Sequence, residues 1–227
     1  MPVIAIDGPN ASGKGTLSQL GAAELKWHLL DSGALYRLVA LDAVRREVAL
    51  DDGEALAGIA AGLDVTFTPG PAQEPALVSL NGEDVTAALR TEAAGESASR
   101  VAVLPAVREA LLERQRAFAR APGLVADGRD MGTVIFPQAP LKIFLTASAE
   151  VRALRRYKQL SDKGIDVNLA ALSVEIAQRD RRDSGREIAP LKPAPDALEI
   201  DTSVLSIEAV LARVLSEARS RGFSPVP

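Results

Sequence analysis

The stretch Gly8-Pro9-Asn10-Ala11-Ser12-Gly13-Lys14-Gly15-Thr16 says most about the fold of this 227-residue chain. Residues 3–6 before it are apolar and partly β-branched, which predicts a buried strand. Residues 14–26 are rich in leucine and alanine, which predicts a helix. A strand, a glycine-rich turn and a helix in this order form the setting of a phosphate-binding loop. We therefore expect backbone N–H groups of the turn and the N-terminus of the helix to bind phosphate.

All nine residues of this phosphate loop (residues 8–16) are candidates for nucleotide binding, and Lys14 is expected to reach the β- and γ-phosphates. The strict form of the motif places serine or threonine directly after the lysine. Here Gly15 stands at that position and the hydroxyl follows at Thr16. A metal ion at this loop is therefore expected to be held mostly by phosphate and water, and no protein metal ligand is assigned.

Strand and helix patterns alternate along the rest of the chain. We predict strands over residues 27–30, 124–127, 141–146 and 197–200. A helix capped by Ser32 follows the second strand, and further helices are expected over residues 91–102, 105–121, 149–161, 168–184 and 207–218. This alternation predicts an α/β fold with a parallel five-stranded sheet and helices on both faces.

Residues 63–85 have a different pattern. Residues 63–68 alternate with period two, Pro69-Gly70-Pro71 interrupts them, and residues 76–80 run into Asn81-Gly82. An Asn-Gly pair between apolar runs is a strong hairpin signal. We expect a small antiparallel insert in an otherwise α/β chain.

Composition excludes several classes of site. The chain has no cysteine and one histidine, which rules out disulfides, thiolate sites and multi-histidine metal sites. That histidine, His28, falls in a predicted buried strand and is expected to be structural. The net charge of −4 argues against nucleic-acid binding. No apolar run approaches the length of a membrane span and no leader is recognised, so we expect no membrane association and a cytoplasmic location.

The chemistry that accompanies the bound nucleotide is open at this point. The chain lacks the Asn-Lys-x-Asp pattern of GTPases, and its length favours a small kinase. A hydroxyl acceptor would need a carboxylate base, for which Asp7, Asp31 and Asp127 are candidates. A phosphate acceptor needs no base, because it is already an anion at neutral pH, but it requires many positive charges. A nucleotide-dependent switch without phosphoryl transfer is the third possibility.

Arginines from separate segments are expected at one edge of the sheet. Arg37 lies one turn into the helix after the second strand, and Arg129 follows the strand that ends at Asp127. Ligands of open α/β sheets bind outside these carboxyl strand ends. Two later helices carry further arginines at helical spacings. They are Arg152, Arg155 and Arg156 on the first helix, and Arg179, Arg182 and Arg186, together with Asp183, on the second.

Three motifs together resemble bacterial cytidylate kinases. They are Asp31-Ser32-Gly33-Ala34-Leu35-Tyr36-Arg37, Asp127-Gly128-Arg129-Asp130-Met131-Gly132, and Arg179-Asp180-Arg181-Arg182-Asp183 followed by Arg186. The resemblance runs from Val3 to about Arg219 and includes the insert. The family often has glycine where this chain has Asn10 or Ala11. The resemblance implies a P-loop kinase fold, ATP as phosphoryl donor with Mg²⁺, CMP or dCMP as acceptor, and a monomer.

The resemblance also implies roles for individual residues. An acceptor pocket would be lined by Ser32, Arg37, Ser99, Arg108, Arg129, Asp130, Arg179, Asp183 and Arg186. Within it Ser99, Arg108 and Asp130 would read the cytosine edge. Asp183, helped by Arg179, would bind sugar hydroxyls.

The acceptor phosphate is assigned to Arg37, Arg129 and Arg186, and catalysis to Lys14, Arg129 and Arg186. Arg155 and Arg156 are assigned to ATP, and Arg152 is expected near the transferring group. Asp7 is expected to be structural. Asp127 either caps the next turn or orients loop water, or it orients Mg²⁺. Trp27 and Tyr36 are expected to pack in the core.

We expect one kinase domain over residues 1–227. Its core would comprise residues 1–32, 103–148 and 187–222. A monophosphate-binding lobe would span about residues 33–102, with the insert at 63–85. Residues 149–186 would form a helical lid.

Overall fold

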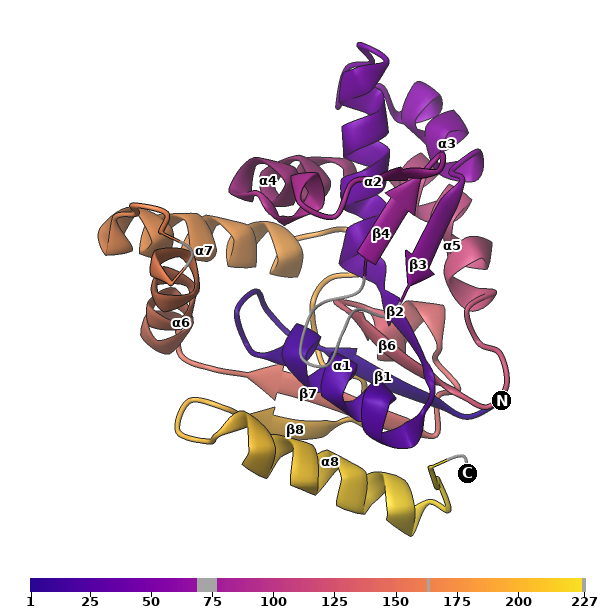
Figure 1. Cartoon of the computed structure of the whole chain (residues 1–227), viewed down its shortest axis with the longest axis vertical. Coiled ribbons are helices and arrows are strands. Elements are labelled where there is room, and N and C mark those ends of the chain that lie inside the picture. The colour runs from indigo at the N-terminus through magenta and orange to yellow at the C-terminus, as the bar shows by residue number, and fades with distance from the viewer. Residues whose placement is uncertain (69–76, 163, 226–227) are drawn as a thin grey trace. The chain divides into compact units, whose positions relative to one another are not determined.

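The computed structural model of the chain describes residues 1–68, 77–162 and 164–225 (Figure 1). They form two compact units. The first unit comprises Met1–Leu30 and Ala119–Pro227, and the second comprises Asp31–Phe118. The two units are described separately below.

A five-stranded sheet organises the first unit, in the order β2-β6-β1-β7-β8. The strands are β1 (Val3–Asp7), β2 (His28–Asp31), β6 (Leu124–Gly128), β7 (Leu141–Thr146) and β8 (Leu198–Asp201). The pairs β1–β6, β1–β7 and β7–β8 are parallel. The predicted α/β fold with a central parallel sheet is therefore confirmed, and the phosphate loop follows the middle strand.

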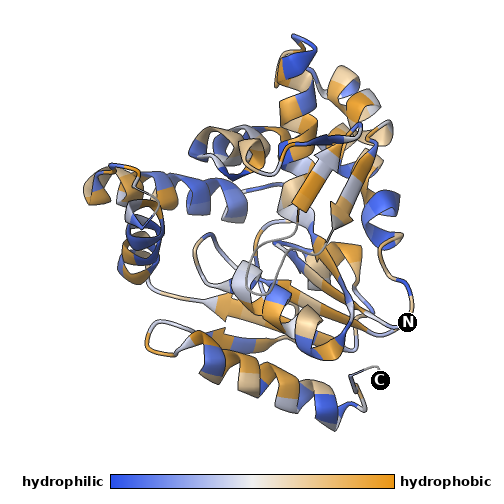
Figure 2. Cartoon of the chain, in the orientation of Figure 1, coloured by the Kyte–Doolittle hydropathy of each residue, from blue (hydrophilic) through white to orange (hydrophobic). Residues whose placement is uncertain are grey.

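Two helices, α1 (Lys14–Leu25) and α8 (Ile207–Ser220), cover one face of this sheet and contact each other. Ile4 and Ile6 of β1, Leu17 of α1 and Val214 of α8 belong to one buried cluster. Figure 2 shows apolar residues along the central strands, and both apolar and polar residues along α8. Each fully buried side chain of this kind contributes about 1.5–3 kcal/mol, so the cluster anchors the strand ends that carry the site.

A short helix, η2 (Met131–Ile135), follows β6 and contacts both β1 and β6. Two further helices, α6 (Ala149–Ser161) and α7 (Leu169–Ser184), pack against each other. Ser148 and Asn168 cap them by accepting from the N–H groups of Val151 and Ala171. Both helices match the predicted ranges, and their expected movement as a lid stays a prediction.

The second unit holds the predicted insert, a sheet of three strands in the order β3-β4-β5. The strands are β3 (Val65–Thr68), β4 (Leu77–Leu80) and β5 (Glu83–Asp84), and both pairings are antiparallel. Asn81 and Gly82 have φ of 51° and 80°. Two positive φ values are what a type I′ hairpin turn requires, so the expected hairpin is confirmed. The predicted break at Pro69-Gly70-Pro71 lies outside the described residues.

The other elements of the second unit are helical. They are α2 (Ser32–Arg45), α3 (Gly53–Ala61), η1 (Ala88–Arg90), α4 (Glu92–Val101) and α5 (Pro105–Arg116). Helix α3 was not expected, and α5 ends before residue 121. Because α5 packs against α3, the second unit extends to Phe118, beyond residue 102, where we expected the lobe to end.

Three local predictions are wrong. Asp31, not Ser32, caps α2 by accepting from the N–H of Ala34 at 3.1 Å, because β2 ends at Asp31. His28 is exposed, since β2 is an edge strand, and its Nε2 lies 2.8 Å from the carbonyl oxygen of Ala121. Arg186 lies beyond the end of α7 and not on it.

Trp27 and Tyr36 are buried, as expected. Within residues 1–68, 77–162 and 164–225, no helix combines the length and the apolar character needed to cross a bilayer.

Candidate active site

The backbone of the phosphate loop is shaped by residues with positive φ. Gly13 precedes α1 with φ of 93°, and no side chain caps the first turn of that helix. A Cβ on Gly8 would lie 2.4 Å from the carbonyl oxygen of Leu145, so only glycine fits beside β7. Ala11 has φ of 58°, a left-handed conformation that disfavours alanine by about 1–2 kcal/mol. Glycine would adopt this conformation freely.

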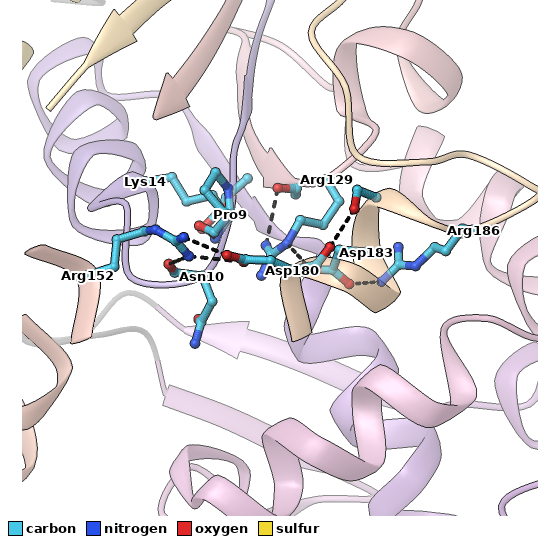
Figure 3. Close-up of polar contacts among 11 residues, drawn as sticks. Pro9, Asn10, Lys14, Arg129, Arg152, Asp180, Asp183 and Arg186 are labelled. Atoms are coloured by element: carbon cyan, nitrogen blue, oxygen red, sulfur yellow. Dashed lines mark hydrogen bonds and ion pairs between the residues drawn. The ribbon is translucent and has the colours of Figure 1, made fainter. Parts of the chain in front are cut away.

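Lys14 is buried at the start of α1, among oxygen atoms (Figure 3). Its Nζ donates to the carbonyl oxygen of Pro9 at 3.4 Å and lies 4.0 Å from Oδ1 of Asp127. Asp127 is also buried, near the end of β6. An ammonium group at the mouth of this loop supplies the charge that a polyphosphate requires.

Asp7, at the end of β1, supports the turn that follows β6. Its two carboxylate oxygens accept from the N–H groups of Met131 and Gly132, each at 2.8 Å. The pKa of Asp7 is raised to about 7. Burial is the largest cause, the charges of Asp130 and Asp127 add to the rise, and the two hydrogen bonds oppose it. The structural role expected of Asp7 matches these contacts, which fix the turn that carries Arg129.

Arg129, Asp183 and Arg186 form a partly buried ion cluster in the first unit, with the carboxylate of Asp183 fully buried (Figure 3). Nε of Arg129 donates to Oδ2 of Asp183 at 2.9 Å, and Nη2 of Arg186 donates to Oδ1. Burial raises the pKa of Asp183, but the charges of Arg129, Arg186 and Arg179 outweigh it and leave that pKa below its ordinary value. The cluster holds two guanidinium groups in fixed positions around one carboxylate.

The arginines of α6 contact three different segments. Arg152 donates to Asp180 of α7 and to the carbonyl oxygen of Asn10. Arg155 donates from Nη1 to Oγ1 of Thr202 at 2.9 Å, and Arg156 donates to Gln159. Thr202 follows β8, and its Oγ1 lies 3.0 Å from the carbonyl oxygen of Ser12. Helix α6 is therefore tied to the phosphate loop both directly and through Thr202.

The second unit contains four of the predicted acceptor residues. Arg37 donates to the carbonyl oxygen of Leu89 at 2.7 Å. Arg108 is buried, donates to the carbonyl oxygen of Ala102, and lies with its guanidinium carbon 6.0 Å from the ring centre of Tyr36.

Ser32 and Ser99 are both buried within that unit. In the part of the chain that the structure describes, the hydroxyl of Ser99 has no hydrogen-bond partner. A buried polar atom without a hydrogen-bond partner is uncommon unless a ligand or a water molecule supplies the hydrogen bond.

The three carboxylates considered as bases for a hydroxyl acceptor are each engaged elsewhere. Asp7 accepts two backbone hydrogen bonds, Asp31 caps α2, and Asp127 lies beside Lys14. No observation therefore favours a hydroxyl acceptor.

Sequence reasoning missed two residues at this site, Asp180 and Thr202. Asp180 precedes Asp183 by three residues, a helical spacing that could have drawn attention to it. Thr202 stands in no recognisable motif, because its contacts come from distant segments.

Comparisons with known proteins place the chain among relatives of one kind. The family model described as cytidylate kinase matches residues 4–220. A cytidylate kinase of Stutzerimonas stutzeri is 59% identical over 224 residues, covering 99% of this chain and 98% of the relative. One from Shewanella frigidimarina is 60% identical, covering 94% and 93% of the two chains. One from Pseudomonas syringae pv. syringae is 60% identical, covering 98% and 97%.

Proposed function

This chain belongs to the cytidylate kinase family, and we propose that it transfers the γ-phosphoryl group of ATP to CMP and dCMP. The acceptor phosphate oxygen forms a bond to the γ-phosphorus as the bond to the β-γ bridging oxygen breaks. The products are ADP and CDP or dCDP. The similarity to cytidylate kinases over nearly the whole chain is the observation that carries the activity.

The donor site is assigned to the phosphate loop. Backbone N–H groups of residues 8–16 and the uncapped start of α1 suit the triphosphate. Lys14 neutralises charge on the β- and γ-oxygens. Arg155 and Arg156, on α6, are the further cations that we assign to ATP.

Residues for the acceptor are assigned within each unit separately: the guanidinium groups around Asp183 in the first unit, and Ser32, Arg37, Ser99 and Arg108 in the second. Arg129 and Arg186 suit a phosphate monoester because their positions are fixed before it binds. Their charge offsets the repulsion between two polyanions, which is the main obstacle to this transfer. Asp183, with Arg179, is assigned to sugar hydroxyls, and Arg37 to the acceptor phosphate.

The cytosine edge offers both hydrogen-bond donors and acceptors, and we assign it to Ser99, Arg108 and Asp130. The partnerless hydroxyl of Ser99 supports this assignment. Ser32, buried at the start of α2, is assigned to the same acceptor. Closure of α6 and α7 would exclude water, which would otherwise accept the phosphoryl group.

Mg²⁺ is proposed as the cofactor, held mostly by phosphate oxygens and water. Among the residues that the structure describes, no three acidic or histidine side chains form a metal site. Mg²⁺ binds oxygen ligands and usually keeps several of its water molecules. The hydroxyl of Thr16 and the carboxylate of Asp127 would therefore contact the ion through those waters. When bound, the ion neutralises charge on the β- and γ-oxygens. We further propose that the protein acts as a monomer in the cytoplasm.

An acceptor screen tests the function. ADP release from ATP is measured with CMP, dCMP, UMP, AMP, GMP or a sugar as acceptor. We expect release to depend on the acceptor and to be fastest with CMP or dCMP. A preference for a sugar would indicate a hydroxyl acceptor. Nucleotide binding without acceptor-dependent release would indicate a switch.

A further inference from the structure

The guanidinium group of Arg152 is a fixed part of the first unit (Figure 3). The residue is 5% exposed. Its Nε donates to the carbonyl oxygen of Ala147 at 3.0 Å, and its Nη1 donates to the carbonyl oxygen of Asn10 at 3.3 Å. Asp180 accepts from both terminal nitrogens, at 3.0 Å from Nη1. Most N–H groups of this guanidinium are therefore used inside the protein, which suits a supporting role better than a direct role toward a nucleotide.

The contact with Asn10 determines the direction of a backbone N–H group in the phosphate loop. The carbonyl of Asn10 and the N–H of Ala11 belong to one planar trans peptide and point in opposite directions. By holding the carbonyl, Arg152 makes the N–H of Ala11 point away from α6. Ala11 has φ of 58°, and such a conformation persists only when its surroundings enforce it.

The preceding peptide is held in the same way. Nζ of Lys14 donates to the carbonyl oxygen of Pro9 at 3.4 Å. Two consecutive carbonyl oxygens, those of Pro9 and Asn10, thus each face a cation. Each contact fixes the plane of its peptide, and with it the direction of the N–H groups of Asn10 and Ala11.

We infer that Asp180 is a positioning residue for the donor site, which holds Arg152 against the carbonyl of Asn10 and so orients the phosphate loop for ATP. This inference rests on the proposed function, in which that loop binds the triphosphate. Without the carboxylate, Arg152 would keep a buried charge with no ionic partner and would shift toward solvent.

The two aspartates of α7, Asp180 and Asp183, have different partners. Asp180 faces Arg152 and the phosphate loop, and Asp183, one turn later, faces Arg129 and Arg186. Substitution at the two positions should therefore separate the two substrates. Removing the carboxylate of Asp180 should weaken the binding of ATP, and removing that of Asp183 should weaken the binding of CMP.

Asp180→Asn tests the inference in the full chain, because the amide keeps the shape and removes the charge. The KM for ATP should rise about tenfold, the equivalent of one charge-assisted hydrogen bond, and the KM for CMP should stay within about twofold. Direct binding of a fluorescent ATP analogue should weaken by the same factor. Glu175→Gln, the same change at an exposed position of α7, is the matched control and should leave both constants unchanged. Equal losses for both substrates, or unchanged ATP affinity, would overturn the inference.

A double-mutant cycle tests whether Asp180 acts through Arg152. The ATP affinity of Asp180→Ala combined with Arg152→Ala should be no lower than that of Arg152→Ala alone. Additive losses would contradict the proposed path. Lys14→Ala, measured beside them, separates this inference from the proposed function. If Lys14→Ala loses ATP affinity and Asp180→Asn does not, the positioning role of Asp180 is rejected and the donor site at the phosphate loop is retained. If neither loses it, the donor site is wrongly placed.

Discussion

Arg129 and the buried Asp183 form an ion pair, with Nε of the arginine 2.9 Å from Oδ2 of the aspartate. They are 54 residues apart in the chain, one after β6 and the other on α7. The pair connects the turn after β6, which Asp7 supports, to helix α7, which carries Asp183. The guanidinium of Arg129 is therefore in place before any acceptor phosphate arrives, and less of the binding energy is spent on ordering it.

Asp183→Asn is expected to weaken CMP binding selectively. The variant removes the charge that holds Arg129 and Arg186 and an acceptor for the sugar hydroxyls, so the KM for CMP should rise about tenfold or more. The KM for ATP should change by less than about twofold. Steady-state assays in which each nucleotide is varied in turn measure both constants. Parallel increases in both would remove Asp183 from the acceptor site.

Lys14→Ala should reduce turnover by about a hundredfold or more while the protein stays folded, since Lys14 stabilises charge that develops on the transferring group. Lys26→Ala is a matched control, because Lys26 is exposed just after the same helix. Initial rates at saturating ATP and CMP make the comparison, with circular dichroism as the test of folding. Full turnover by Lys14→Ala would exclude this lysine from the mechanism.

Asp7 should make stability depend on pH near neutrality. Its pKa of about 7 lies above the ordinary aspartate value, so the folded protein binds this proton more tightly than the unfolded chain. The resulting stabilisation is complete below about pH 4 and is lost as pH rises through about 7.

Asp7→Asn does not titrate at this position and isolates the effect. Relative to the variant, the wild-type free energy of unfolding should fall by up to about 4 kcal/mol between pH 4 and pH 8. Urea unfolding of both proteins across this range measures the difference. A difference that stays constant with pH would show that Asp7 is not responsible.

Gly123→Ala should destabilise the first unit. A Cβ at this position would lie 2.4 Å from Cδ2 of Trp27, whose ring packs at 5.3 Å from that of Phe223. Relieving this overlap should cost about 1–3 kcal/mol. Gly21→Ala, in α1 with no atom within 4 Å of the new Cβ, should instead stabilise by about 0.5–1 kcal/mol. Thermal unfolding compares the two, and an unchanged melting temperature for Gly123→Ala would refute the steric argument.

The order of strands and helices in the first unit could be predicted from the sequence because apolar runs and turn residues mark its elements clearly. Helix α3 was missed because glycine and alanine dominate its sequence, so its apolar period is weak. Its burial of Leu56 and Ile59 depends on packing against α5, which sequence periodicity alone does not reveal. The cap of α2 was misplaced by one residue because Asp31 and Ser32 are both good capping residues.

The charged cluster could be predicted in part. Helical spacing brought Asp183 and Arg186 together, and they do meet, although α7 ends at Ser184. Nothing in the sequence indicated that Asp180 meets Arg152, 28 residues away, or that Arg152 reaches Asn10. Such contacts depend on how α6 packs against α7 and the phosphate loop. Spacing within one helix carries no information about them.

The central claim is that one phosphoryl group passes from ATP to CMP at this site. The most direct measurement quantifies ADP and CDP together, by chromatography, after incubating the protein with ATP, Mg²⁺ and CMP. We predict equal amounts of ADP and CDP and no ADP above background when CMP is omitted. ADP that appears without CDP, or at the same rate without CMP, would contradict the account.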